Sequence, residues 1–256
     1  MTQKQITEIA LAQSAADLGC APEDFLKTDN TVVSSAVRSG ARAYLKQPYP
    51  CHIVSYGCGA AAAADPAISD ELRQFLDGIR PVTKCFSTPH LGELDALLSR
   101  HGFTVGHLSE YWLPDPARLR SLPCPYETRL LNHADFAELY MPEWSNALCA
   151  DRAALDVLGV GAYDGDTLVG LAGCSADCAD MWQIGVDVLP TYRRKGIASA
   201  LTSRLALEIL AHGKVPFYCC AWSNLSSAKN AVKSGFSPAW IELDSRIISN
   251  EPRRIK

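Results

Sequence analysis

The chain contains no apolar run of eighteen residues, and charged side chains interrupt its first twenty residues, MTQKQITEIALAQSAADLGC. A membrane-spanning helix needs about 20 apolar residues, and a secretory signal peptide needs a continuous apolar segment of about 7–15 residues. Neither pattern is present. The sequence therefore predicts a cytoplasmic protein that does not interact with membranes.

An excess of positive charge is also missing. The 256 residues include 24 Lys and Arg against 28 Asp and Glu, which gives a net charge of −4. Domains that bind nucleic acid in general are usually basic. We therefore expect no nucleic-acid partner, and we interpret any basic cluster as a local site.

The ten cysteines lack the spacing of a structural zinc site. Cys174 and Cys178 are separated by three residues, and Cys219 and Cys220 are adjacent. In a chain of this length with no secretory leader, reduced thiols are the better interpretation. We expect no metal.

Four prolines between Pro114 and Pro125 divide the sequence into two halves. Proline-rich segments are typical of linkers, so we predict an N-terminal α/β domain over 1–113, a linker over 114–125 and a second domain over 126–256. In the first half we expect helical structure over 1 to about 48, with 32–45 mixed. We also expect strands over 51–57, 82–88 and 105–113, helices over 68–79 and 92–102, and a turn over 59–65.

The second half predicts the element order β-α-β-β-β-α-β-α-β. Asp164-Gly165 between two alternating apolar runs is a strong hairpin signal. A long amphipathic helix follows over 197–213. In both halves a strand and a helix precede a Gly-Phe pair, at Gly102-Phe103 and at Gly235-Phe236. This similarity favours a degenerate repeat, in which the first half has lost its ligand loop.

Basic residues followed by glycine stand where a strand passes into a helix. Arg193, Arg194 and Lys195 precede Gly196, and the helix pattern begins at Ile197. The first N–H groups of a helix have no intrahelical partner, and the helix dipole places partial positive charge there. Glycine lets a ligand approach the backbone. The segment therefore predicts a phosphate or pyrophosphate site.

The second half resembles the GNAT superfamily of acyl-CoA-dependent N-acetyltransferases. Arg193-x-x-Gly196-x-Ala198 is similar to the family's Q/R-x-x-G-x-G/A loop. Asn224-x-x-Ser227, followed by Gly235-Phe236, is similar to its second cofactor segment. The whole chain is also similar to bacterial proteins in which a GNAT domain follows an N-terminal domain of comparable length.

The resemblance implies a mixed α/β fold for 126–256, with a splayed, mostly antiparallel central sheet flanked by helices. It also implies that acetyl-CoA is the co-substrate. The pyrophosphate would lie on the backbone of residues 194–198, and the pantetheine arm would pair with the strand that holds Asp187. An N–H near Val188 would stabilise the oxyanion. The cofactor-binding residues expected from this resemblance are Val186, Val188, Arg193, Arg194, Lys195, Gly196, Ile197, Ala198, Asn224 and Ser227.

The proton-transfer groups are less well specified. Many family members carry a tyrosine acid seven positions after the asparagine, where this chain has Ala231. Tyr218 is our candidate acid, and Tyr192 and Ser227 are alternatives. Asp187 is our candidate base, ahead of three weaker options, which are Glu143, Asp180 and His133.

These features predict an N-acetyltransferase in which an amine attacks acetyl-CoA directly. The expected partner is a small-molecule amine or an amino terminus, and a homodimer is left open as the assembly. One alternative is a regulatory protein that binds acyl-CoA without catalysis, which Ala231 favours. Another is a nucleotide-binding or RNA-associated domain, against which the acidic balance argues.

Overall fold

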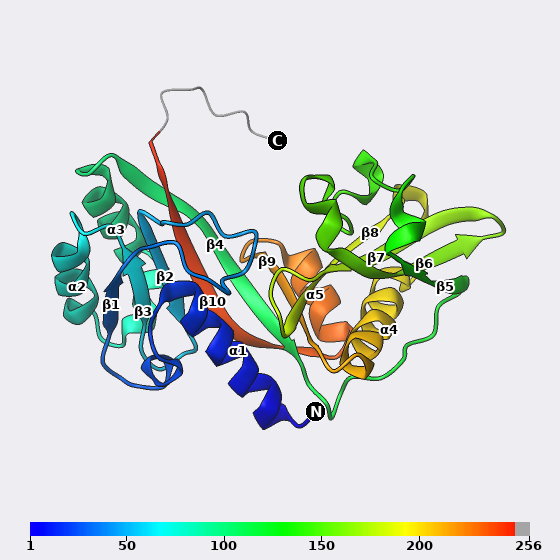
Figure 1. Ribbon diagram of the computed structural model, residues 1–256, viewed down its shortest axis with the longest axis horizontal. Coiled ribbons are helices and arrows are strands. Elements are labelled where there is room, and N and C mark those ends of the chain that lie inside the picture. Colours follow the sequence, from blue (N-terminus) through cyan, green and yellow to red (C-terminus); the bar gives the residue numbers. More distant parts are fainter. Residues whose placement is uncertain (249–256) are drawn as a thin grey trace. The chain divides into compact units, whose positions relative to one another are not determined.

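The computed structural model describes residues 1–248, which form two compact units (Figure 1). The first comprises Met1–Ala10 and Tyr111–Ala239, and the second comprises Leu11–Glu110 together with the chain from Trp240 onward. The chain changes unit inside the first helix, after Ala10, and inside two strands, after Glu110 and after Ala239. The expected linker, 114–125, therefore lies within the first unit, and the last strand is shared with the second.

The first unit contains a mixed sheet, which confirms the predicted fold class. Its strands follow the order β4-β9-β8-β7-β6-β5. All the pairs between β5 and β8 are antiparallel, whereas β8 and β9 are parallel. The strand bounds are β4 (Phe103–Pro114), β5 (Glu127–Asn132), β6 (Asp156–Asp164), β7 (Thr167–Ser175), β8 (Met181–Val188) and β9 (Val215–Ala221).

Local sequence explains the hairpin between β6 and β7. Asp164 pairs with Thr167, and Gly165 in the intervening turn has φ +61°. A tight hairpin turn needs a residue with positive φ, which glycine adopts without steric cost. The hairpin predicted from Asp164-Gly165 is confirmed.

Two helices of the first unit, α4 and α5, pack against strands of its sheet. Helix α4 (Ile197–Ala211) buries Leu201, Leu205 and Ile209 completely, at the four-residue spacing of one helix face. Gly213 follows its C-terminus, and the φ of +73° at this glycine is typical of the residue after a helix. Helix α5 (Leu225–Lys233) follows β9.

The segment between β5 and β6 departs from the expected helix. It contains three short 3₁₀ helices, η3 (His133–Phe136), η4 (Pro142–Trp144) and η5 (Ala150–Leu155). Pro142 cannot donate a backbone hydrogen bond, so no helix that begins after β5 can continue through it.

The second unit contains the strand order β1-β3-β2-β10-β4. Helices α2 and α3 pack against it through one apolar cluster that includes Leu72, Leu76, Leu94 and Leu98. The element bounds are α1 (Gln3–Leu18), η1 (Pro22–Phe25), β1 (Thr31–Ser34), β2 (Cys51–Ser55), β3 (Ala61–Ala64), α2 (Ser69–Gly78), η2 (Val82–Phe86), α3 (His90–Ser99) and β10 (Phe236–Ile247).

Three expectations for this half were wrong. Ala61–Ala64 forms the buried strand β3 and not a turn, because it pairs with β1 on one edge and with β2 on the other. The expected strand over 82–88 is the 3₁₀ helix η2, which follows Pro81. Helical structure in 1–48 is confined to α1 and the single turn η1. The proposed repeat between the two halves stays a prediction.

A charged network is buried in the second unit. Arg42 donates from Nε to Asp17 Oδ2 (2.6 Å) and from Nη2 to Glu242 Oε1 (2.5 Å). His52 Nε2 lies 3.2 Å from Glu242 Oε2, and Trp240 Nε1 donates to Glu242 Oε1 (2.7 Å). Burial alone would raise the pKa of Glu242, but Arg42 and His52 outweigh it and hold the pKa far below its usual range.

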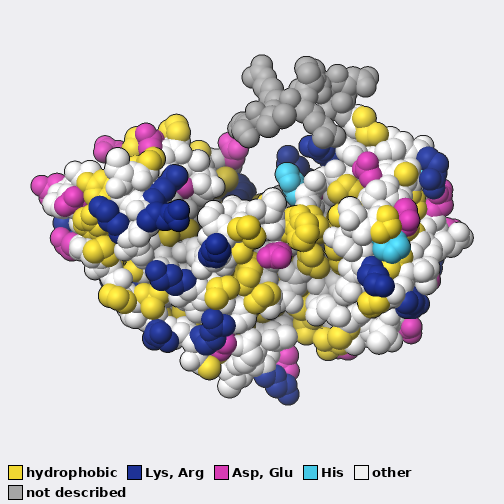
Figure 2. Space-filling view, turned by 180° about the vertical axis from the view of Figure 1, so that it is seen from behind, with side chains coloured by type: hydrophobic (Ala, Val, Ile, Leu, Met, Phe, Trp, Pro, Cys, Tyr) yellow, Lys and Arg dark blue, Asp and Glu magenta, His cyan; other side chains and the backbone are white. Residues whose placement is uncertain are grey.

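Within residues 1–248, no helix is both long enough and apolar enough to cross a bilayer. The same residues contain no cluster of three or more side chains suited to hold a metal ion. On the face shown in Figure 2, Lys and Arg side chains lie in separate groups among acidic and apolar ones.

Candidate functional site

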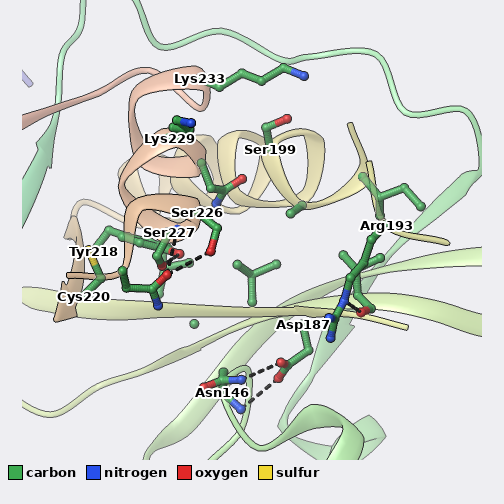
Figure 3. A pocket seen from close by; sticks show the side chains of 18 of the residues that line it. Asn146, Asp187, Arg193, Ser199, Tyr218, Cys220, Ser226, Ser227, Lys229 and Lys233 are labelled. Atoms are coloured by element: carbon green, nitrogen blue, oxygen red, sulfur yellow. Dashed lines mark hydrogen bonds between the residues drawn. The ribbon is translucent and has the colours of Figure 1, made fainter. Parts of the chain in front are cut away.

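A cavity of about 1030 Å³ opens in the first unit between β8, β9 and the starts of α4 and α5 (Figure 3). Its walls come from three stretches of sequence, which are residue 146, residues 183–199 and residues 218–233. The lining residues are Asn146, Gln183–Val188, Tyr192–Arg194, Gly196–Ser199, Tyr218–Ala221, Asn224, Ser226, Ser227, Lys229, Asn230 and Lys233.

The cavity exists because β8 and β9 pair over only part of their length. The parallel register runs from Met181–Val215 to Ile184–Tyr218 and ends there. Residues Gly185–Val188 stay paired with β7 on the other edge. This is the splay that the resemblance implies.

The open edge of β8 presents the backbone groups of Val186 and Val188. Leu189 N–H donates to Val169 of β7 (3.0 Å). Backbone groups alternate in direction along a strand, so the N–H groups of Val188 and Val186 point away from β7, toward the cavity. Consistent with this direction, the Val188 carbonyl accepts a hydrogen bond from Arg193 Nε (3.0 Å).

The start of α4 forms a second wall. Gly196 has φ +85° and Arg194 has φ +66°, so the chain turns sharply before the helix. The first α4 hydrogen bond runs from Ala200 N–H to Gly196 O (3.1 Å). The N–H groups of Ile197, Ala198 and Ser199 therefore have no intrahelical acceptor, and all three residues line the cavity.

A cation that the motifs did not reveal lies beside this helix start. A Cβ atom built on Gly196 would lie 3.7 Å from Lys233 Nζ. Lys233 is the last residue of α5, two turns beyond the second motif, and Lys229 lines the cavity from the preceding turn. Their four-residue spacing places both on one helix face, which is the signal available in the sequence.

The side chain of Lys195 is positioned differently from its neighbours. Its ammonium donates to Tyr126 OH (3.0 Å) and lies 4.9 Å from the ring centroid of Tyr192. The Tyr126 hydroxyl raises the pKa of Lys195. Lys195 is not among the residues that line the cavity.

Asn224 caps α5. Its Oδ1 accepts from Ser227 N–H (3.2 Å) and from Ser226 Oγ (2.9 Å). Asn224 therefore has the N-cap role for which asparagine is favoured. Asn224, Ser226 and Ser227 all line the cavity.

Tyr218 and Ser227 share a hydrogen bond of 2.7 Å at the point where β8 and β9 separate. Burial raises the pKa of Tyr218, although the Ser227 and Asn230 side chains oppose this. Ala231 is completely buried. Tyr192, the other alternative acid, donates to Asp164 Oδ2 (3.0 Å).

Asp187 accepts three hydrogen bonds from the segment that follows η4 (Figure 3). Its Oδ2 accepts from the backbone N–H groups of Asn146 (2.8 Å) and Ala147 (3.0 Å), and its Oδ1 accepts from Asn146 Nδ2 (2.6 Å). Gly185 makes this contact sterically feasible, because a Cβ atom there would overlap the Asn146 carbonyl.

The three weaker base candidates lie outside the cavity lining. His133 Nδ1 contacts the Asp156 carbonyl (2.7 Å), and Asp180 forms an ion pair with Lys214 (3.4 Å). Glu143 lies in η4 and is exposed.

The structure thus brings together every expected cofactor residue except Lys195, and it adds Asp187 and Tyr218 to the same cavity. Motif spacing did not reveal Asn146, Gln183, Lys229 and Lys233. Asn146 and Gln183 carry no pattern of their own, because only the tertiary fold places them at the cavity.

Comparison with known proteins agrees with this geometry. Residues 115–239 match the family model of the GNAT acetyltransferases, so this part of the chain is a GNAT acetyltransferase domain. The match ends one residue before the chain enters the second unit. No curated protein was found to match the sequence.

Several solved structures are similar at low identity. A GCN5-related N-acetyltransferase from Kribbella flavida is 16% identical, with 92% of this chain and 95% of that chain covered and a TM-score of 0.49. A GNAT-family protein from Novosphingobium aromaticivorans is 19% identical, with 56% and 66% covered and a TM-score of 0.43. This chain therefore covers slightly less than two thirds of the Novosphingobium protein. The Salmonella typhimurium protein yncA, solved with acetyl-CoA, is 16% identical, with 51% and 98% covered and a TM-score of 0.36.

Proposed function

We propose that this domain transfers an acetyl group from acetyl-CoA to a primary amine by direct attack in a ternary complex. The observation that carries the proposal is the combination of the β8–β9 splay with the basic start of α4 in one cavity. A long ligand with a phosphate-rich end and an amide-rich arm matches these two surfaces.

The pyrophosphate lies at the start of α4 in this proposal. The N–H groups of residues 194–198 bind its oxygens, and Arg194 and Lys233 supply formal charge. Lys195 contributes through its backbone, because its ammonium is held by Tyr126.

The pantetheine arm lies along the unpaired edge of β8, where Val186 directs its backbone groups into the cavity. The Val188 N–H then points at the thioester carbonyl and stabilises the oxyanion that forms when the amine attacks. Most of the rate enhancement comes from holding the two reactants together and from this preorganised donor.

The thiolate of coenzyme A leaves near Tyr218. We assign Tyr218, which is hydrogen-bonded to Ser227, as the acid that protonates it. The amine nitrogen loses one proton to solvent as the amide forms. A thiol has an ordinary pKa of about 8.5, so its thiolate is a tolerable leaving group even without an acid. Loss of the usual tyrosine at Ala231 is therefore compatible with turnover.

Release of free thiol from acetyl-CoA, measured over a panel of primary amines, tests this function. Amine-dependent release above the background rate supports it, and acetylated product identified by mass spectrometry completes the assignment. A second candidate is a regulatory protein that binds acyl-CoA without catalysis, which Ala231 favours. Calorimetric binding of coenzyme A with no turnover across the panel would establish that alternative.

A further inference from the structure

The cavity wall carries a strong imbalance of charge. Its lining includes four cationic side chains and one carboxylate, Asp187. Coenzyme A is a polyanion, and the basic residues at the start of α4 and on α5 match it. A second positive charge on the acceptor would need a carboxylate of its own, because unpaired charges are costly to desolvate.

The hydrogen bonds of Asp187 direct its carboxylate toward the wall of the cavity. Three donors occupy its two oxygens, and two of these donors are backbone N–H groups of Asn146 and Ala147. Backbone donors cannot rotate away as a flexible side chain can. Gly185 lies two residues earlier on the same face of β8, where its missing side chain lets the Asn146 carbonyl approach. Gly185 and Asp187 together fix one wall of the cavity.

Nearby carboxylates do not replace Asp187. Glu138 and Glu143 belong, like Asn146, to the segment between β5 and β6, but they do not line the cavity. Asp164 accepts a hydrogen bond from Tyr192. Within the described residues, no second acidic side chain is part of this lining.

Four neutral amides line the cavity. Asn224 caps α5 and Asn230 donates to Thr202 Oγ1 (3.2 Å), so Asn146 and Gln183 are the two that we assign to the acceptor. Asn146 donates from Nδ2 to Asp187 Oδ1 (2.6 Å), and Gln183 donates from Nε2 to Cys219 Sγ (3.0 Å). Each amide therefore directs its NH₂ group to the protein, which leaves the carbonyl oxygen as the acceptor. Such an oxygen can accept the N–H of one amine without supplying a counter-charge.

We propose that the acceptor is a primary amine that carries no second cationic group, and that Asp187 positions the Asn146–Ala147 wall without binding the acceptor. This inference rests on the proposed acetyl transfer. It excludes diamines, polyamines and aminoglycoside-like compounds as preferred substrates.

Matched acceptors test the substrate class. The first pair is 4-aminobutanol and 1,4-diaminobutane, and the second is 5-aminopentanol and 1,5-diaminopentane. Each pair differs by a hydroxyl in place of one ammonium. At pH 8 we expect kcat/KM per reactive amine to be at least about tenfold higher for the amino alcohols. Equal or higher values for the diamines would overturn the inference and leave the acetyl transfer intact.

Asp187→Asn tests the positioning role, with Asp166→Asn in the exposed β6–β7 turn as the matched control. We expect Asp187→Asn to raise KM for every amine by a similar factor. The affinity for coenzyme A should stay within about twofold, and the shape of the pH profile should not change. A loss confined to diamines, or disappearance of a limb of the pH profile, would contradict the assignment. Absence of turnover with every amine would refute both the proposed function and this inference.

Discussion

Tyr218 OH and Ser227 Oγ lie 2.7 Å apart at the point where β8 and β9 separate. The pair joins two of the three hydroxyl groups that the sequence offered as acids, and both line the cavity. Removal of the Tyr218 hydroxyl should therefore slow departure of the thiolate. We expect Tyr218→Phe to lower kcat by up to about 100-fold while the affinity for coenzyme A changes little. Steady-state kinetics and calorimetry measure the two effects.

Tyr192→Phe is the matched comparison for this variant, because the Tyr192 hydroxyl donates to Asp164. We expect a kcat within a few-fold of wild type. An equal loss of kcat in both variants would remove Tyr218 from its assigned role.

The raised pKa of Tyr218 gives a prediction about alkaline pH. Burial disfavours the phenolate, so the hydroxyl keeps its proton above its ordinary pKa of 10.0. An acid group is active below its pKa. Turnover at saturating amine should therefore show no decline between pH 7 and about pH 9.5. A decline in this range in wild type that is absent in Tyr218→Phe would show that Tyr218 titrates near neutrality.

Lys233 gives a prediction about the phosphate end of the cofactor. Its ammonium lies beside Gly196, at the expected pyrophosphate position. We expect Lys233→Ala to weaken binding of coenzyme A by about tenfold, the order of one charge-assisted hydrogen bond. Lys214→Ala, which removes an exposed partner of Asp180, is the control.

Dephospho-coenzyme A locates the phosphate that Lys233 contacts. If Lys233 contacts the pyrophosphate, the variant should lose the same factor with coenzyme A and with its dephospho form. A loss seen with coenzyme A alone would place Lys233 at the 3′-phosphate instead.

Gly185 allows a prediction about stability. Gly185→Ala forces a Cβ atom against the Asn146 carbonyl, so the wall beside Asp187 must shift. We expect a loss of about 1–3 kcal/mol in the free energy of unfolding, measured with urea. In Gly92→Ala, within α3, the new Cβ atom meets no atom within 4 Å. That control should be stabilised by about 0.5–1 kcal/mol. Similar results for the two variants would exclude the steric account.

The residues that the sequence predicted for the cofactor line one cavity, except Lys195. The Arg193–Ala198 loop and Asn224–Ser227 have fixed spacing, because each starts a helix whose position follows from local chain geometry. The acceptor side could not be predicted, since Asn146 reaches the cavity only through its contact with Asp187 across 41 residues. Such a contact depends on tertiary structure and leaves no periodic pattern.

The N-terminal half shows the same limit for secondary structure. Four successive alanines have weak strand propensity, and the chain still forms β3 because two neighbouring strands bury it. The proline-rich segment was interpreted as a linker from composition. The structure places it inside the first unit, where Asp115 N–H donates to Gly235 O (2.9 Å).

Glu242 makes the stability of the protein depend on acid. Its folded-state pKa lies below the ordinary value of 4.5, because Arg42 and His52 favour the carboxylate more than burial opposes it. A lowered folded-state pKa stabilises the protein when the pH is above the ordinary pKa. This contribution is lost as the pH falls through and below the ordinary pKa.

We expect Glu242→Gln to lower the free energy of unfolding by about 3–5 kcal/mol at pH 7, since it leaves Arg42 buried without one of its two charged partners. Glu8→Gln removes an exposed pair with Lys4 and should cost less than about 1 kcal/mol. Between pH 6 and pH 3, the free energy of unfolding measured with urea should fall more steeply for wild type than for Glu242→Gln. Parallel pH dependence in the two proteins would show that another group carries the acid sensitivity.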